Sequence, residues 1–150
     1  MNSKLIVRQA LPADIDSLVE LLQLLFAIET DFSVDRERQR CGLEMMLQAE
    51  KFRCVLAAEI NRKVVGMCSA QLLVSTAEGG FKAMIEDVVV AEEYRGRGIG
   101  AQLLKSIAQW AAKQGATRLD LLADRGNGPA LAFYKKLNWT FTELICLQKK

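Results

Sequence analysis

The stretch Ile85–Gln102, with the sequence IEDVVVAEEYRGRGIGAQ, decides the fold of this chain. Its first part, Ile85–Val90, is rich in β-branched residues and predicts a strand. The polar hinge Ala91–Tyr94 follows, and the glycine loop Arg95–Gly100 comes next. After the loop, apolar residues recur at helical spacing, and Gly115 is placed to end that helix. The stretch therefore predicts a strand, a glycine-rich turn and a helix in succession.

A strand that leads through glycines into a helix forms a site for an anion. The first amides of a helix have no partner within the helix, and the helix dipole places partial positive charge there. Glycine lets the backbone approach a phosphate closely and adopt positive φ angles, so several N–H groups can point at one ligand. We therefore expect this loop to bind a phosphate-containing molecule.

Two motifs resemble those of the GNAT acyltransferase superfamily. The first, Gln/Arg-x-x-Gly-x-Gly/Ala, is filled by Arg95, Gly98 and Gly100. The second is an Asn followed by an Ala-x-x-Phe-Tyr helix, and it is filled by Asn127 and by the segment Ala130–Tyr134. The two motifs occur in the order that is typical of the family, which makes the resemblance specific.

The specific part of the resemblance covers Ile85–Trp139, and the N-terminal half agrees only in its order of elements. Asn138 and Trp139 stand where the family usually has Gly-Phe, a small departure outside the expected site. The resemblance implies acetyl-CoA as the acyl donor, with its pyrophosphate on the amides of residues 97–101 and its pantetheine arm paired to the strand backbone. The cofactor-binding residues that it implies are Val88, Val89, Val90, Arg95, Gly96, Arg97, Gly98, Ile99, Gly100, Ala101, Asn127 and Tyr134.

The glycine loop also has a second interpretation. Residues Gly96–Ala101 satisfy the dinucleotide pattern G-x-G-x-x-G/A, and Asp120 follows at about the expected distance. In a dinucleotide fold the strand runs directly into the first glycine, whereas here five residues intervene between Val90 and Gly96. Too little chain remains for a second nucleotide-binding half. The context therefore favours acyl-CoA, and a purely structural glycine turn is a third interpretation.

Two side chains are candidates for the chemistry. By resemblance, Asn127 hydrogen-bonds the pantetheine and Tyr134 places its hydroxyl beside the cofactor sulfur, where a donor of pKa about 10 could protonate the departing thiolate. Glu86 could take the proton of an attacking amine, since such an amine has a pKa of about 10.4 and the chain has no histidine. The alternatives are a packing role for Tyr134 and a surface or ion-pair role for Glu86.

Alternation along the strand predicts the surroundings of the candidate base and of its neighbour. It places Glu86 on the same face as Val88 and Val90, and Asp87 on the opposite face in a structural role. Glu29, Asp31 and Asp35 crowd the join between two predicted helices, which borders the acceptor site in the family. Glu29 and Asp31 are the substrate candidates, because acidic residues could attract a cationic amine. A charged loop that is merely solvated is the ordinary alternative.

Length and composition limit the class of protein. A chain of 150 residues that is 51% hydrophobic predicts a single domain, residues 1–150. A net charge of +2 gives no reason to expect a nucleic-acid partner. Four scattered cysteines and no histidine predict neither a metal site nor a disulfide scaffold, and they favour a reducing, cytoplasmic location. The chain has no long apolar run that would predict a membrane segment.

The order of the predicted elements indicates a mixed α/β fold, antiparallel early and parallel around the cofactor, with about four helices. The strands other than Ile85–Val90 are predicted at Leu5–Arg8, Phe52–Ile60, Val64–Leu73, Arg118–Leu122 and Phe141–Gln148. The helices other than the one that ends at Gly115 are predicted from Pro12 to about Thr30, from a Ser33 cap to about Gln48, and over Pro129–Leu137.

We therefore expect an enzyme that transfers an acetyl group from acetyl-CoA to a primary amine, by direct attack in a ternary complex. A small amine or polyamine is favoured over a protein as the acceptor. The alternatives are an acyl-CoA-binding regulatory module without turnover and a nicotinamide-dinucleotide-binding protein. The sequence leaves the oligomeric state open, a homodimer included.

Overall fold

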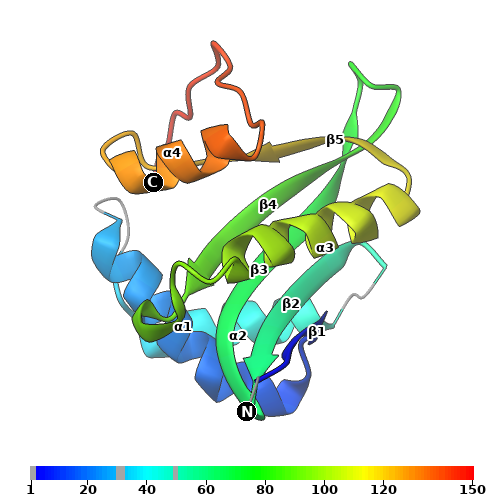
Figure 1. The fold of residues 1–150 in the computed structure, drawn as a ribbon. Coiled ribbons are helices and arrows are strands. Elements are labelled where there is room, and N and C mark those ends of the chain that lie inside the picture. The colour runs from blue at the N-terminus through cyan, green and yellow to red at the C-terminus, as the bar shows by residue number, and fades with distance from the viewer. Residues whose placement is uncertain (1–2, 30–32, 49–50) are drawn as a thin grey trace.

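A computed structural model of the chain describes residues 3–29, 33–48 and 51–150. One mixed sheet runs through its centre in the order β1-β2-β3-β4-β5 (Figure 1). The strands are β1 (Leu5–Gln9), β2 (Arg53–Ile60), β3 (Lys63–Ser75), β4 (Gly80–Val90) and β5 (Ala116–Leu121). Neighbouring strands are antiparallel except β4 and β5, which are parallel. The mixed sheet predicted from the sequence is confirmed.

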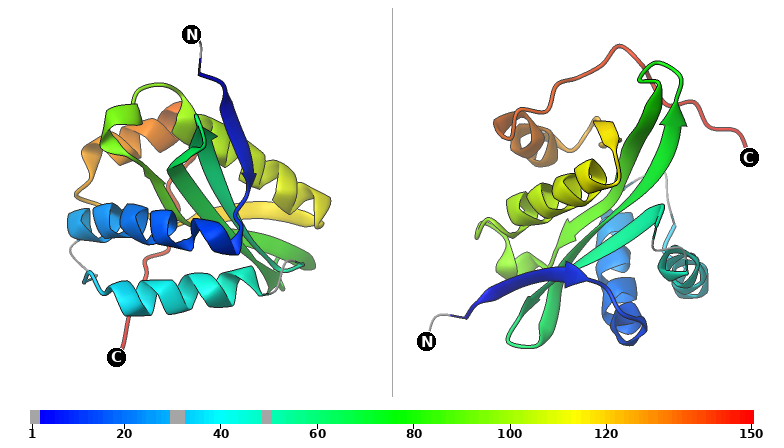
Figure 2. Two further views of the ribbon diagram at one scale, coloured as in Figure 1. Left: turned by 90° about the horizontal axis from the view of Figure 1, so that it is seen from below. Right: turned by 90° about the vertical axis from the view of Figure 1, so that its right-hand side faces the viewer.

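Four α-helices in the described ranges cover both faces of this sheet and make three layers. They are α1 (Ile15–Ile28), α2 (Arg36–Leu47), α3 (Ile99–Lys113) and α4 (Gly128–Lys136). Helices α1 and α2 lie on one face, and α3 and α4 lie on the other (Figure 2). Gly115, with a φ of 92°, follows the end of α3 as the sequence predicted.

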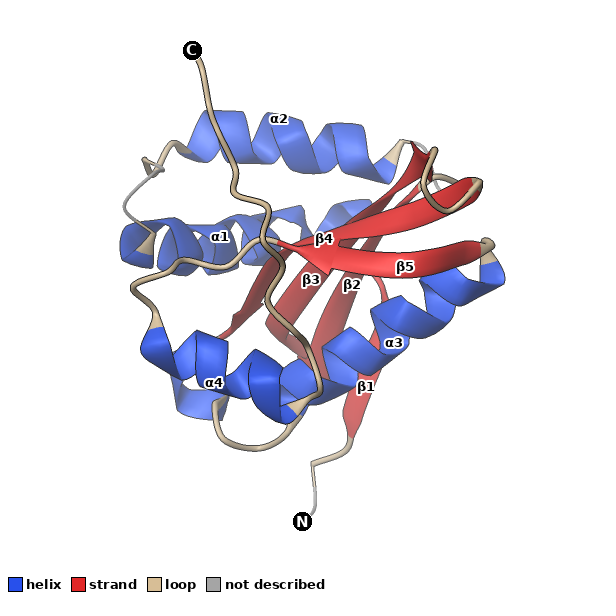
Figure 3. Cartoon of the chain, turned by 90° about the horizontal axis from the view of Figure 1, so that it is seen from above, coloured by secondary structure: helices blue, strands red, loops and turns tan. Residues whose placement is uncertain are grey.

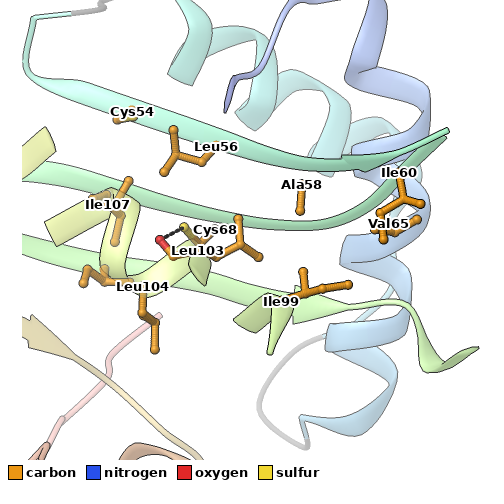
Figure 4. Packing of buried hydrophobic residues seen from close by; sticks show 12 residues of the cluster. Cys54, Leu56, Ala58, Ile60, Val65, Cys68, Ile99, Leu103, Leu104 and Ile107 are labelled. Carbon is orange, nitrogen blue, oxygen red and sulfur yellow. Dashed lines mark hydrogen bonds between the residues drawn. The ribbon is translucent and has the colours of Figure 1, made fainter. Parts of the chain in front are cut away.

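Each face of the sheet has its own hydrophobic core. On the face that α3 and α4 cover, Leu103 and Ile107 of α3 are fully buried. There the thiol of Cys68 from β3 lies 3.7 Å from the carbonyl oxygen of Leu103 (Figure 4). Leu18 and Val19 of α1 are fully buried on the opposite face. The amphipathic stripes of the two helices therefore fix which side of the sheet each helix covers.

Local signals explain two connections. Asn61 and Arg62 both have positive φ angles, 51° and 65°, as a type I′ turn requires, and this confirms the predicted hairpin between β2 and β3. Helix α2 begins later than the sequence analysis placed it. Its N-cap is Asp35, whose Oδ1 accepts a hydrogen bond from the amide of Arg38 at 3.1 Å, so the prediction of a Ser33 cap is wrong.

The strand predicted over Phe141–Gln148 is wrong. After α4 the chain continues as irregular coil to the C-terminus (Figure 3). Its apolar side chains Phe141, Leu144, Ile145 and Leu147 are exposed. A strand forms only where a neighbouring strand takes its backbone hydrogen bonds, and these apolar positions do not alternate as a half-buried strand would.

Candidate active site

The C-terminal half of β4 has a strand partner on one side only. Pairing between β4 and β5 ends at Ile85 with Leu121, while β4 continues to Val90. On the other side, Val89 and Val90 still pair with β3. Figure 1 shows β4 and β5 diverging toward their C-terminal ends. Backbone groups of residues 86–90 that face β5 can therefore accept an extended ligand, as a sheet edge accepts an added strand.

The glycine loop lies directly after this edge and has the form of an anion site. Gly96 and Gly98 have φ angles of 76° and 79°, which favour glycine, and Gly98 is the N-cap of α3. Within the described part of the chain, no acceptor receives a hydrogen bond from the amides of residues 96–101. Six consecutive backbone donors at the positive end of a fifteen-residue helix are thus available to one ligand.

Arg95 and Arg97 add positive charge beside these amides. Arg95 Nε donates to the carbonyl oxygen of Val90 at 2.9 Å, and Arg97 Nη2 donates to that of Glu93 at 3.2 Å. The guanidinium of Arg97 also lies 5.1 Å from the ring centroid of Tyr94. Neither arginine forms an ion pair with a carboxylate among the residues described. Both charges therefore remain available to phosphates.

Gly100 links the two sequence motifs. A Cβ atom at this position would lie 3.1 Å from Cζ of Phe133 on α4. Such a contact is tighter than ordinary packing, so a side chain here would force the phenylalanine ring away. The absence of a side chain at Gly100 lets α4 pack closely on the first turn of α3.

Helix α4 begins at the asparagine of the second motif. Asn127 is its N-cap, and Oδ1 of its side chain accepts a hydrogen bond from the amide of Ala130 at 3.1 Å. The sequence analysis assigned Asn127 only to the cofactor and missed this role, although an asparagine two residues before Pro129 is a typical helix start. The NH₂ group of Asn127 remains able to donate to a ligand.

Tyr134 lies on α4 and packs against the core beneath α3. Its ring centroid lies 5.2 Å from that of Phe133 and 6.1 Å from that of Trp139. Burial, with smaller contributions from Cys68 and Glu29, raises the pKa of Tyr134 to about 12. The hydroxyl is therefore protonated throughout the physiological range, as a proton donor must be.

A β-bulge in β4 changes the predicted pattern of side chains. Ser69 pairs with Glu86 and Met67 pairs with Val89, so Asp87 and Val88 together stand opposite Cys68. Asp87 has a φ of 55°, which is rare for a residue other than glycine.

The bulge overturns the predicted faces of β4. The sequence analysis placed Glu86 on one face with Val88 and Val90, and Asp87 on the other. Instead, Val88 and Val90 pack in the core beneath α3 and α4. Glu86 and Asp87 both line a pocket on the face that α1 and α2 cover. One extra residue in the strand therefore brings two carboxylates to the same side of the sheet.

The pocket that these carboxylates line has a volume of about 460 Å³. Its walls come from α1 and α2, and its floor comes from β2, β3 and β4. The lining residues are Leu22, Phe26, Arg38, Gln39, Gly42, Leu43, Met45, Met46, Arg53, Ser69, Gln71, Glu86 and Asp87. This size and this mixture of apolar walls and a few polar groups suit a small molecule.

Asp87 is the carboxylate with the shifted pKa. Burial, together with the charge of Glu86 and against a hydrogen bond from Ser69, raises the pKa of Asp87 to about 6. Ser69 Oγ lies 3.3 Å from Asp87 Oδ2 and 3.2 Å from the carbonyl oxygen of Glu86. A carboxylate with a pKa near neutrality in a pocket is a candidate proton acceptor.

Two of the acidic residues that the sequence analysis placed near the acceptor site are found at helix ends. Glu29 is the C-cap of α1, and its charge contributes to the raised pKa of Tyr134. Asp35 is the N-cap of α2. Neither of them lines the pocket beneath α2. Asp31, the other substrate candidate, lies outside the described residues.

The dinucleotide interpretation does not fit this fold. Only β4 and β5 are parallel within the described sheet, whereas dinucleotide folds have a mostly parallel sheet. Asp120, the expected ribose ligand, is engaged by Lys82 Nζ at 3.1 Å and by Arg118 Nε at 3.3 Å.

Neither a metal cluster nor a membrane span is found where the structure is described. The described residues contain no group of three or more histidine, cysteine, aspartate or glutamate side chains that could hold a metal ion. None of the helices described is long and apolar enough to cross a membrane.

The loop, the half-paired strand and α4 together define the class of protein. The chain belongs to the GNAT acetyltransferase family, whose model matches residues 16–139. An aminoglycoside N-acetyltransferase solved with CoA superposes with a TM-score of 0.86 and 18% identity, over 100% of this chain and 97% of that one. This likeness confirms the predicted fold.

Curated relatives match shorter segments. An uncharacterized N-acetyltransferase of Methanocaldococcus jannaschii is 32% identical over 88 residues, which is 58% of this chain and 39% of that protein. A thialysine N-ε-acetyltransferase of Bos taurus is 38% identical over 58 residues, which is 39% of this chain and 34% of that protein. The matches therefore span well under half the length of these relatives.

Replacing Asp87 by asparagine should stabilise the protein at neutral pH. The folded state holds the Asp87 proton more tightly than the unfolded state, with a pKa of about 6 against the ordinary 3.8. The wild type therefore loses stability as the pH rises from about 4 to 6, and asparagine avoids this loss. The gain at pH 7.5 is at most about 3 kcal/mol and vanishes below pH 4. Urea unfolding at pH 4 and 7.5 measures it, and an equal difference at both values would contradict the burial of Asp87.

Proposed function

We propose that this protein transfers an acetyl group from acetyl-CoA to the primary amine of a small molecule. The observation that carries the proposal is the set of six backbone amides, those of residues 96–101, that form no hydrogen bond among the described residues. They follow shortly after Val90, where the half-paired part of β4 ends. A pyrophosphate suits the amides, and an arm with amide groups suits the strand edge. CoA contains both groups in one molecule.

The cofactor would lie along β4 with its sulfur toward α4. In this arrangement the pyrophosphate occupies residues 96–101, and the pantetheine pairs with the main chain of residues 88–90. Tyr134 packs against the core cluster that contains Cys68, which stands opposite the bulge, and by the resemblance to the family its hydroxyl would lie near the point where the arm ends. In this arrangement Tyr134 would be the donor to the thiolate that leaves.

Transfer would proceed by direct attack of the amine nitrogen on the thioester carbonyl carbon. The C–S bond breaks as the C–N bond forms, the departing thiolate takes a proton from Tyr134, and a carboxylate takes a proton from the amine. An ordinary amine is almost fully protonated at pH 7, a handicap of roughly 4–5 kcal/mol, so a base is valuable. No cysteine or serine nucleophile is required by this scheme.

Two carboxylates compete for the role of base. Glu86 is the residue that the sequence analysis favoured, and it faces the pocket. Asp87 is better matched to the task, because its pKa of about 6 makes it a stronger base than an ordinary carboxylate while it is still ionised at pH 7. We therefore propose Asp87 as the base, with Glu86 as a neighbouring charge that strengthens it.

A regulatory module that binds acyl-CoA without turnover is the alternative function. Such a module needs the loop and the strand edge but neither a proton donor at the sulfur nor a base in a pocket. The raised pKa values of Tyr134 and Asp87 on either side of β4 favour catalysis. Release of free thiol in the presence of an amine distinguishes the two functions.

CoA should stabilise the protein, and a bulky residue at Gly98 should abolish the effect. Ligand at about 100 times its Kd adds roughly 2.7 kcal/mol to the free energy of unfolding. Valine at Gly98 resists positive φ and blocks approach of the phosphates. Thermal unfolding with millimolar acetyl-CoA, compared with NAD, measures the effect.

Gly79→Val is the matched control for this experiment. Gly79 also has positive φ, 68°, and open space around it, but it lies in the turn between β3 and β4. Both variants carry a backbone strain of about 1–2 kcal/mol, yet only Gly98→Val should lose the response to CoA. A normal CoA response in Gly98→Val would place the pyrophosphate elsewhere.

The pH dependence of kcat/KM should identify the base. In the wild type, log kcat/KM should rise with slope about 1 below pH 6, because Asp87 must be ionised to take the proton of the ammonium group, and should level off above pH 6. Asp87→Asn should lower kcat/KM by about 10²–10⁴ and leave a slope of 1 throughout. If Glu86→Gln has this effect and Asp87→Asn does not, Glu86 is the base.

Tyr134→Phe should lower kcat by about 10²-fold with little change in KM. The ring and its packing remain, and only the donor to the departing thiolate is lost. Because the pKa of Tyr134 is about 12, neither enzyme should show an alkaline decline from this residue below about pH 11. Steady-state kinetics measure the loss. A kcat within twofold of the wild type would mean that Tyr134 serves packing alone.

A further inference from the structure

The pocket beneath α2 carries opposite charges at its two ends. Glu86 and Asp87 lie at the β4 end, and Arg53 lies at the β2 end. Arg53 pairs with Gln71, while Ser69, two residues along β3, pairs with Glu86. Arg53 and Glu86 are therefore two strands and two residues apart, which corresponds to roughly 12 Å between their Cα atoms. The pocket thus spans the length of a short chain molecule.

Arg53 is held in place without being neutralised. Its Nη1 donates to the carbonyl oxygen of Met45 near the end of α2 at 3.0 Å. No carboxylate in the described ranges forms an ion pair with it. Arg38, at the rim, is 88% exposed and already pairs with Asp35, so it contributes less. A half-buried guanidinium with unused donors favours a planar anion such as a carboxylate.

Between the two charged ends, the helical walls of the pocket carry apolar side chains, and its floor on β3 carries Ser69 and Gln71. Leu22 and Phe26 come from α1, and Leu43 and Met46 come from α2. The apolar walls suit methylene carbons, whose burial there needs no polar partner. A ligand that fits the pocket therefore has an ammonium group at one end, an aliphatic chain, and an anion at the other end.

We propose that the acceptor is an amine that carries a carboxylate, such as a diamino acid, with its reacting amine at Asp87 and its carboxylate on Arg53. This inference rests on the proposed acetyl transfer and narrows its substrate. It also separates the acceptor from a simple polyamine. A second ammonium in the place of the carboxylate would face the guanidinium of Arg53, and these like charges repel.

Lysine and cadaverine test the proposal, because they differ only in the carboxylate. We expect kcat/KM for lysine to exceed that for cadaverine by about 10- to 100-fold, the range for a hydrogen bond between charged groups. Arg53→Gln should remove this preference by weakening lysine alone, and Arg53→Lys should restore part of it. Arg36→Gln is the control, because Arg36 lies on the same helix as Arg38 but does not line the pocket, and it should keep the full preference.

Binding separates a failure of this inference from a failure of the proposed function. Lysine is titrated into CoA-saturated wild type and Arg53→Gln, and thiol release with acetyl-CoA is followed in parallel. Lysine binding that Arg53→Gln loses supports the inference even if no acetyl transfer occurs, in which case the proposed function fails instead. Acetyl transfer that is equal or faster with cadaverine, or a lysine preference that survives in Arg53→Gln, overturns the inference. Absence of lysine binding to the wild type also overturns it.

Discussion

The hydrogen bonds of β4 are the constraint on which this structure depends. Its first half is paired on both sides, and its second half only with β3, because β5 ends at Leu121 while β4 continues to Val90. An interior strand with unpaired backbone is unstable unless water or a ligand takes the hydrogen bonds. The same half-paired strand leads into the glycine loop, so the unpaired backbone groups of β4 and the free amides of the loop lie next to each other along the chain. A cofactor with both amide and phosphate groups suits this arrangement, because its amide groups could pair with the strand and its phosphates could bind the loop.

The bulge at Asp87 changes which side chains of β4 point to each face of the sheet. A regular strand would turn Glu86 and Asp87 to opposite faces, and only one carboxylate could reach the pocket. The bulge turns both to the face that α1 and α2 cover, while Val88 and Val90 remain in the other core. The positive φ of Asp87 and its burial both cost stability. Features of this kind concentrate at functional sites, and here they give the carboxylate a pKa suited to accepting a proton.

Packing between α3 and α4 joins the two motifs that the sequence separates. Gly100 leaves room for the ring of Phe133, and Tyr134 follows on the same short helix. The position of the tyrosine hydroxyl relative to the glycine loop is therefore set by one close contact and by the cap at Asn127. A side chain at Gly100 would disturb α4, which carries Tyr134, as well as the first turn of α3. This coupling explains why glycine is needed at a position with ordinary helical φ.

The sequence by itself determined the order of the elements, the hairpin at Asn61, the glycine loop and the family, because these depend on local turn chemistry and on periodicity. It did not determine the end of the chain, where an apolar segment predicts a strand but no neighbouring strand pairs with it. Tertiary structure alone decided the pocket beneath α2. The bulge at Asp87 arises from the register of β4 against β3, and Arg53 reaches the same pocket from a strand more than thirty residues earlier in the chain. Register and long-range proximity are properties of the folded sheet, so no pattern within either strand could predict them.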